Sequence, residues 1–212
     1  NVLKKVNSNF QEICVVRTSA FGKVLINDGI VMLTEADEAS YHEMIVHVPL
    51  CVHPSPKDIL VIGGGDGGTV REINKHYQVE KVDVCEIDEM VIEICGEFFP
   101  SLAKSFNNDK VNLYYEDGAE FLKKNKNQYD IIIIDSSDPI GPGETLFTKQ
   151  FYQSLFLSLK KDGIAVTQLE SIFWHQKFIK DTFKFIKKIF PISHYYYTMV
   201  PAYPSGMIGF SF

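Results

Sequence analysis

No hydrophobic run in this sequence approaches the length of a membrane-spanning helix. Such a helix needs about 20 consecutive apolar residues, whereas runs such as the four isoleucines of residues 131–134 have the length of buried strands. Cysteine is also scarce, with four residues and no C-x-x-C pair, which favours free thiols in a reducing compartment over disulfide bonds. No targeting segment is visible, so we expect a cytoplasmic protein with no membrane partner.

A basic excess is missing as well. Lysine and arginine number 21 against 27 acidic residues, which gives a formal charge of −6. Proteins that bind nucleic acid usually carry a basic stripe or excess, so we expect no nucleic-acid partner. Hydrophobic residues make up 45% and charged residues 23% of the 212 residues, as in ordinary globular proteins. This length predicts one domain of usual size with a small appendage.

Two familiar catalytic patterns are absent. There is no G-x-S-x-G motif, which argues against a serine hydrolase of the nucleophile-elbow type. His42 and His47 resemble the histidine pair of a zinc helix, but they stand five residues apart rather than four. On a helix their side chains diverge by about 140°, so a shared metal ligand role is disfavoured and no metal site is expected.

The first fifty residues have the pattern of a small antiparallel unit. Short strand-like runs occupy residues 10–16, 23–26 and 29–33, and Asn27-Asp28-Gly29 between the last two is a strong turn signal. Residues 37–50 favour a helix, and His53-Pro54-Ser55-Pro56 then interrupts the chain. We therefore predict an N-terminal β-hairpin unit with a linking helix over residues 1–52 and a second domain over residues 53–212.

Strands and helices alternate in the second part. Strands are predicted at 59–62, 81–85, 111–115, 129–135 and 163–168, with two more around 194–199 and 207–212. The segments between them favour helices, one of which carries Phe178, Ile179, Phe183 and Ile186 on one stripe. Strands that are apolar on both faces and joined by helices predict a doubly wound, mostly parallel α/β sheet of the Rossmann-like type.

A glycine-rich loop follows the first of these strands. Gly63, Gly65 and Gly68 satisfy G-x-G-x-x-G, and Glu86 ends the next strand 21 residues after Gly65. Such an acid can bind both ribose hydroxyls, so the pattern predicts a nucleoside site, with a structural turn as the alternative. Asp66 inside the loop would repel a pyrophosphate. It favours a donor with a cationic tail, such as an S-adenosyl compound, unless it only caps the following helix.

Further acids follow the later strands. Asp117, next to Gly118, could accept from an adenine amino group or cap a helix. Asp135 and Asp138 close a buried strand before a Gly/Pro-rich loop, and Glu170 would enter the same crevice. Three converging carboxylates without metal ligands suit an organic di-cation.

The sequence resembles the spermidine synthases, the aminopropyltransferases of polyamine synthesis, over essentially its whole length. The matching stretches are Gly22–Leu25, Asp28-Gly29, Leu33–Glu35, Asp37-Glu38, Tyr41–Met44, Gly63–Gly68, Cys85–Asp88, Asp135–Pro142 and Tyr203–Gly206. The resemblance implies a small β domain on a methyltransferase-like Rossmann domain, assembled as a homodimer or homotetramer. It implies aminopropyl transfer from decarboxylated S-adenosylmethionine to putrescine, with the donor a co-substrate and no separate cofactor.

The resemblance also implies roles for individual residues. Asp135 would stand beside the attacking nitrogen as the catalytic group and share the donor's amine with Asp66. The other donor contacts implied are Gln11 and Glu86 at the ribose, Asp117 and Gly118 near the adenine, Gly63 and Gly65 in the loop, and His42. The putrescine slot would be formed by Tyr41, Asp138, Glu170 and Tyr203, with Gln168 as a further contact.

Some positions depart from the family pattern. Met32 stands where many members have glutamine, which removes a polar contact near the donor, and Gly143 and Ala202 replace a common alanine and threonine. Parts of the family's N-terminal β domain and C-terminal tail are expected to lie outside these residues. Two alternatives stay open: a putrescine N-methyltransferase that uses intact S-adenosylmethionine, and an inactive homologue that binds polyamine.

Overall fold

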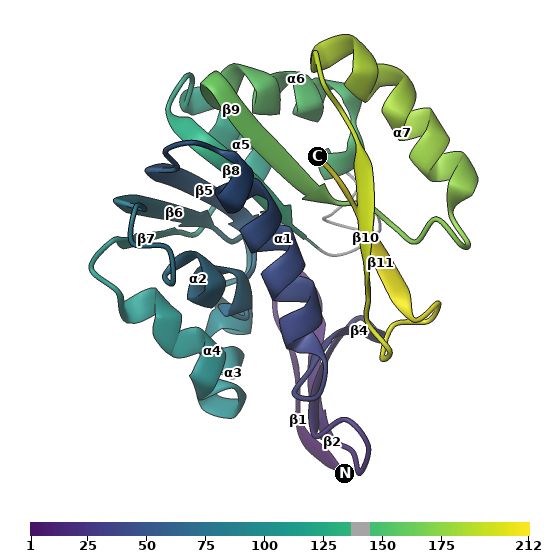
Figure 1. Ribbon diagram of the computed structural model, residues 1–212. Coiled ribbons are helices and arrows are strands. Elements are labelled where there is room, and N and C mark those ends of the chain that lie inside the picture. Colours follow the sequence, from purple (N-terminus) through teal and green to yellow (C-terminus); the bar gives the residue numbers. More distant parts are fainter. Residues whose placement is uncertain (137–144) are drawn as a thin grey trace.

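The computed structural model describes residues 1–136 and 145–212 and contains two β-sheets (Figure 1). The N-terminal sheet has four antiparallel strands in chain order: β1 (Val2–Asn7), β2 (Glu12–Arg17), β3 (Lys23–Asn27) and β4 (Ile30–Thr34). β2, β3 and β4 confirm the strands predicted at residues 10–16, 23–26 and 29–33. β1 was not predicted, because its lysines and mostly exposed side chains hide the alternation that marks a half-buried strand.

The turn between β3 and β4 has the geometry that its sequence favours. Asp28 and Gly29 have φ angles of 49° and 81°, and Asn27 pairs with Ile30 across the turn. A two-residue hairpin of this kind requires left-handed backbone at both central positions, which Asp-Gly tolerates. This turn fixes which residues of β3 and β4 face the rest of the molecule.

The second sheet has seven strands in the order β10-β11-β9-β8-β5-β6-β7. β5 (Asp58–Gly63), β6 (Lys81–Cys85), β7 (Val111–Tyr114), β8 (Tyr129–Asp135) and β9 (Leu159–Gln168) are parallel, whereas β10 (Tyr195–Met199) and β11 (Met207–Ser211) form an antiparallel edge. The predicted Rossmann-like fold with a small β unit before it is confirmed.

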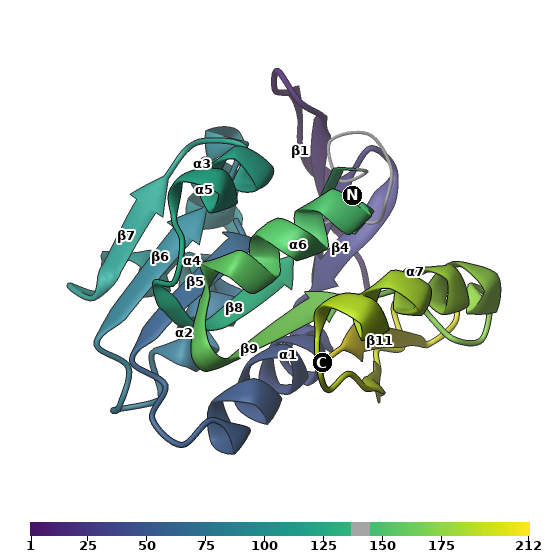
Figure 2. The same ribbon diagram turned by 90° about the horizontal axis from the view of Figure 1, so that it is seen from above.

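Helices cover both faces of this sheet (Figure 2). Ile59 and Val61 of β5 pack in a core with α1 (Glu38–Val52) and α2 (Gly68–Ile73), whereas Leu60 and Ile62 pack in a second core with α5 (Gly118–Lys124), α6 (Lys149–Ser158) and α7 (Gln176–Ile189). Alternate residues of one strand therefore fill different cores, as expected for a sheet buried on both sides. α1 itself packs against β8, β9 and β10, and the domain boundary between residues 52 and 53 stays a prediction.

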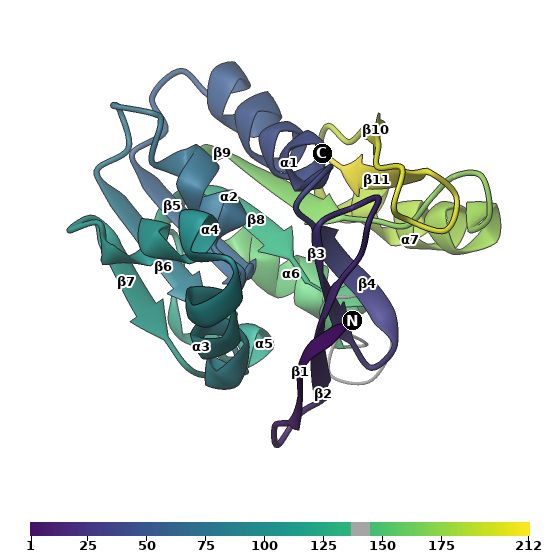
Figure 3. The same ribbon diagram turned by 90° about the horizontal axis from the view of Figure 1, so that it is seen from below.

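A third core joins the N-terminal sheet to the segment of residues 91–103, and Figure 3 shows the two side by side. Ile13 and Leu25 of the N-terminal sheet pack against Val91 and Ile94 of α3 (Glu89–Phe98). Lys23 donates to the carbonyl oxygen of Phe98. The short α4 (Pro100–Ala103) and the 3₁₀ turn Lys104–Asn107, neither of them predicted, follow α3.

Two further expectations from the sequence concern the cysteines and membrane-spanning helices. All four cysteines are free thiols; Cys85 and Cys95 are buried, whereas Cys51 is exposed. Across residues 1–136 and 145–212, no helix combines the length and the apolar character needed to cross a membrane.

The strand order places a crevice at one edge of the sheet. β5 pairs with β6 on one side and with β8 on the other, so the crossovers that leave these strands diverge. In open α/β sheets, ligands bind at the carboxyl ends of the strands at such a point. The backbones of β5 and β8 meet closely there, since Gly64 donates from its N–H to the carbonyl oxygen of Asp135 at 2.8 Å.

A comparison of Gly63 with Gly29 tests whether the close approach of β5 and β8 restricts the residue at position 63. Both have left-handed backbone, with φ of 82° and 81°, but a Cβ at Gly63 would lie 2.1 Å from the Asp135 carbonyl oxygen, whereas one at Gly29 would meet nothing within 4 Å. Gly29→Ala should cost only the backbone term of about 1–2 kcal/mol. Gly63→Ala should cost about 3 kcal/mol or more in urea unfolding, because two strands must separate. Equal losses would contradict the close approach.

Candidate active site

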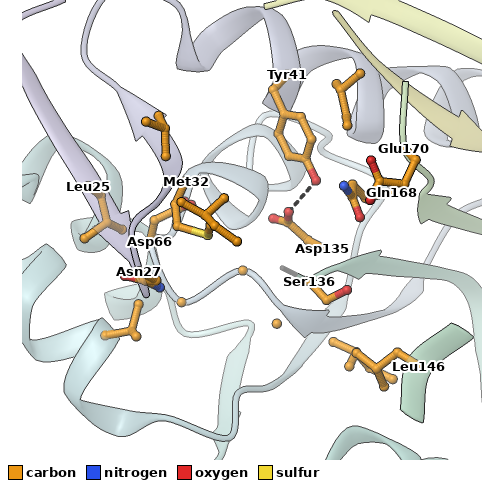
Figure 4. A pocket seen from close by; sticks show the side chains of 18 of the residues that line it. Leu25, Asn27, Met32, Tyr41, Asp66, Asp135, Ser136, Leu146, Gln168 and Glu170 are labelled. Carbon is orange, nitrogen blue, oxygen red and sulfur yellow. Dashed lines mark hydrogen bonds between the residues drawn. The ribbon is translucent and has the colours of Figure 1, made fainter. Parts of the chain in front are cut away.

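A cavity of about 370 Å³ lies between the N-terminal sheet and the carboxyl ends of the parallel strands (Figure 4). Leu25, Asn27 and Met32 line it from β3 and β4, and Tyr41 enters from α1. Further parts of the wall come from the loops that follow β5, β6, β7, β8 and β9, from the turn before β2 and from the segment after β10. The cavity thus collects side chains from nearly every part of the fold.

The glycine loop presents Asp66 to this cavity. Its Oδ1 accepts a hydrogen bond from the N–H of Gly68 at 2.6 Å, at the start of α2. The same carboxylate lies 3.4 Å from Nε2 of His42 and lines the cavity. Gly67 is the N-cap residue of α2, whereas Asp66 accepts from the first N–H of the helix and also lines the cavity.

His42 is almost completely buried between two acids. Its Nδ1 lies 2.6 Å from Oε2 of Glu38, and its Nε2 faces Asp66. Burial alone would lower the pKa of this imidazole, but the charge of Asp66 and the hydrogen bonds to both carboxylates raise it to about 10. His42 is therefore a cation at neutral pH.

The network of charged side chains around His42 extends behind the pocket. Arg71 donates from both terminal nitrogens to Glu38, at 2.8 and 2.9 Å, and from Nε to Glu72 at 2.7 Å. His47, on the other side of α1, contacts Glu72 and His76 instead of the partners of His42. The two histidines of α1 thus diverge as predicted. Among the described residues, no cluster of three or more His, Cys, Asp or Glu is arranged to hold a metal ion.

Asp135, at the end of β8, is a second acid that lines the cavity. Its two oxygens accept from the hydroxyls of Tyr41, at 2.7 Å, and Thr69, at 2.5 Å. Burial, and then the nearby charge of Asp66, raise the pKa of Asp135. Burial opposes ionisation of Asp66 too, but the charge of His42 and the Gly68 N–H hold the pKa of Asp66 below its usual value. One acid is thus a fixed anion and the other a better base than ordinary aspartate.

The opposite wall carries the residues expected at a nucleoside. Glu86 is buried, which raises its pKa to about 7, and its Oε1 accepts from the N–H of Asp88 at 3.0 Å. Gln11 reaches across from the N-terminal sheet and donates to Asp88 at 2.9 Å. Asp117 accepts from the N–H of Glu120 at 3.0 Å and so caps α5, yet it also lines the cavity, as does Gly118.

The far end of the cavity lies beyond Asp135. Gln168 and Glu170 come from the end of β9, and Figure 4 shows both across the pocket from Met32 and Asn27. Oε2 of Glu170 lies 2.7 Å from Nδ1 of His175. The hydroxyl of Tyr203 donates to the carbonyl oxygen of Met32 at 2.8 Å. Asp138 and the loop that follows it lie outside the described residues.

Several residues in or beside the pocket were not found from the sequence. Asp88 was noted as part of a stretch that resembles the family, but nothing in its spacing shows that it accepts from Gln11. Thr69 has no motif that pairs it with Asp135, since their contact depends on how α2 lies against β8. His175 and Asn27 are likewise brought to the cavity by tertiary structure alone.

The comparisons with known proteins agree with this geometry. Residues 38–212 match the family model described as the spermine/spermidine synthase domain, and residues 1–35 match the spermidine synthase tetramerisation domain. A polyamine aminopropyltransferase of Leptospira biflexa is 49% identical over 99% of this chain and 75% of its own length. A spermine synthase of Arabidopsis thaliana is also 49% identical, over 99% of this chain and 58% of its own length.

A solved structure shows the same architecture. The crystal structure of a spermidine synthase in complex with the transition-state analogue AdoDATO superposes with a TM-score of 0.96 at 42% identity, covering 99% of this chain and 72% of that one. The resemblance found in the sequence is thereby confirmed. With both of its segments matched by the family models and its whole length by such relatives, the chain belongs to the spermine/spermidine synthase family of aminopropyltransferases.

Proposed function

We propose that the protein transfers the aminopropyl group of decarboxylated S-adenosylmethionine to putrescine, which yields spermidine and methylthioadenosine. The observation that carries this proposal is the pair Asp66 and Asp135 in one cavity, the first ionised and the second with a raised pKa. A fixed anion suits a cationic donor, and a more basic carboxylate suits removal of a proton from an amine.

The donor half of the cavity fits a nucleoside with a cationic tail. Glu86 and Gln11 are placed to bind ribose hydroxyls, and Asp117 with Gly118 to meet the adenine, while Gly63 and Gly65 allow close approach of the backbone. Asp66 would bind the terminal ammonium of the donor. The intact methionine form would bring its own carboxylate toward Asp66, so methyl transfer from S-adenosylmethionine is disfavoured.

The acceptor half presents carboxylates to a diamine. Tyr41 and Asp135 lie between the two halves, and Gln168, Glu170 and Tyr203 line the far end. We assign the distal ammonium of putrescine to Glu170 and to Asp138, which the sequence places in the same slot. His42 contacts the donor side only through Asp66, because both of its ring nitrogens already face carboxylates.

The reaction needs one free amine. An aliphatic amine has a pKa near 10, so about one molecule in a thousand is unprotonated at pH 7. Asp135 accepts a proton from the near nitrogen of putrescine, whose lone pair then attacks the aminopropyl carbon next to sulfur. The new C–N bond forms as the C–S bond breaks, and the positive sulfonium leaves as a neutral thioether. Because the donor is already activated, we propose that it is a co-substrate and that no separate cofactor takes part.

We also propose that the protein works as a homodimer or homotetramer. The support is the match of residues 1–35 to a tetramerisation domain. These residues form the sheet that supplies Leu25, Asn27 and Met32 to the pocket wall. Assembly through this sheet would therefore hold one side of the pocket in place.

An end-product assay tests the reaction. The protein is incubated with decarboxylated S-adenosylmethionine and a panel of diamines and spermidine, and the products are detected by mass. We expect spermidine to form from putrescine. A longer product formed from spermidine would instead identify spermidine as the acceptor. Calorimetric titration with both forms of the donor should show tighter binding of the decarboxylated one. Preference for the carboxylated form would favour the methyltransferase alternative.

Asp135→Asn should abolish most turnover, while donor binding weakens less. The amide keeps the shape, and its NH2 group donates to one of the two hydroxyls that donate to Asp135 in the wild type, but it cannot take the proton, a role worth roughly 10²–10⁴-fold. Turnover is measured by product mass, and donor affinity by calorimetry. A variant that keeps more than about a tenth of wild-type turnover would refute the assignment of Asp135 as a base.

Glu86→Gln should weaken binding of the donor and stabilise the ligand-free protein at alkaline pH. The pKa of Glu86 is raised from 4.5 to about 7, so the folded state binds its proton more tightly than the unfolded state. Stability contributed by this group is complete below pH 4.5 and is lost as the pH rises to 7. The variant should therefore melt higher than wild type at pH 8 and bind methylthioadenosine less tightly. Glu93→Gln, on the exposed face of α3, is the control and should show neither change.

Glu170→Gln should mainly reduce the capture of putrescine. A charge-assisted hydrogen bond contributes roughly 1.5–3 kcal/mol, so kcat/KM for putrescine should fall about ten- to a hundred-fold. The loss should be smaller for butylamine, which has no second ammonium, and donor affinity should change little. Steady-state kinetics with both amines measure this. An equal loss for the two amines would show that Glu170 serves folding and not the diamine slot.

A further inference from the structure

Asn27 is a polar side chain in an apolar part of the cavity wall. It ends β3, with 8% of its surface exposed, and its Oδ1 has no hydrogen-bond partner among residues 1–136 and 145–212. Its strand partner Ile13 and its neighbour Leu25 on the same face both belong to the apolar core against α3. Among the described residues, therefore, nothing satisfies the Oδ1 atom of Asn27.

An amide in this position lowers the stability of the ligand-free protein. Buried polar groups nearly always find a partner, because a donor or acceptor removed from water without one loses its solvation. An aliphatic side chain would suit the same place on β3. The side chain lines the cavity, and rotation of the amide group exchanges the positions of its oxygen and nitrogen, so a bound ligand can reach the polar end of Asn27.

The register of the strands shows which part of a ligand Asn27 faces. Asn27 pairs with Ile13 across β2 and β3, and Gln11, which directly precedes β2, lines the same cavity. Gln11 binds Asp88, whose N–H donates to Glu86. Figure 4 shows Asn27 beside Leu25, Met32 and Asp66, on the opposite side of the cavity from Gln168 and Glu170. Asn27 thus belongs with Gln11 and Glu86, at the nucleoside end.

We propose that Asn27 binds a ribose hydroxyl of the nucleoside donor. A hydroxyl both donates and accepts, so it can satisfy the amide in either orientation of its oxygen and nitrogen. This contact would supply a polar group to the wall on which Met32 provides none. The proposal rests on the proposed function, since it takes the nucleoside of that reaction as its ligand.

The test combines variants with nucleosides that lack one hydroxyl. Wild type, Asn27→Leu and Asn27→Ala are titrated by calorimetry with methylthioadenosine and with its 2′-deoxy and 3′-deoxy forms. Both variants should bind methylthioadenosine about three- to tenfold less tightly. The loss should disappear for the one deoxy form that lacks the hydroxyl bound by Asn27. Ligand-free Asn27→Leu should also melt about 2 °C or more above wild type, because an unpaired buried amide has been removed.

Asn74→Leu is the matched control. Oδ1 of Asn74 is also buried without a partner in the described part of the chain, but Asn74 does not line the cavity and donates from Nδ2 to Ser105. This variant should bind methylthioadenosine as wild type does and melt lower. Undiminished affinity of the Asn27 variants, or equal losses for all three nucleosides, would overturn the proposal while leaving the aminopropyl reaction in place. Failure of wild type to bind methylthioadenosine at all would instead overturn the proposed function.

Discussion

The site depends on placing two carboxylates side by side in a buried cavity. Asp66 and Asp135 repel one another, and neither could stay ionised there without compensation. The protein supplies a buried cation, His42, held by Glu38, which Arg71 binds in turn. His42 therefore contacts Asp66 directly, while the side chain of Asp135 accepts from the neutral hydroxyls of Tyr41 and Thr69. This asymmetry makes two chemically identical side chains suited to different tasks.

The N-terminal sheet matters as much as the Rossmann-like domain for the shape of the pocket. β3 and β4 supply one wall, and the core between this sheet and α3 holds that wall in position. Gln11 and Ser8 both bind Asp88, at 2.9 and 2.7 Å, so the polar contacts across the junction run directly behind Glu86. A glycine loop and an acid on the next strand are thus only half of the proposed nucleoside site.

Much of this could be predicted from the sequence because the signals are local or periodic. The buried run 129–135, the glycine loop and the Asp-Gly turn each specify their own backbone, and alternation of strands and helices specifies a doubly wound sheet. The antiparallel edge of β10 and β11, the cap-and-contact role of Asp88 and the Thr69–Asp135 hydrogen bond depend on distances between elements. No spacing in one sequence encodes these. β1 was missed because an exposed strand rich in lysine lacks the apolar alternation on which the prediction rests.

The hydrogen bond from Tyr203 to the backbone of Met32 joins the two ends of the chain across the mouth of the cavity. Residues 1–35 and the segment after β10 have no covalent connection there, yet each helps to hold the other. Loosening of the N-terminal sheet would leave the Tyr203 segment without this contact, although the N–H of Ala202 would still donate to Asp37. The two proposed ends of the cavity are in this sense coupled, and a ligand that orders one end lowers the entropic cost of ordering the other.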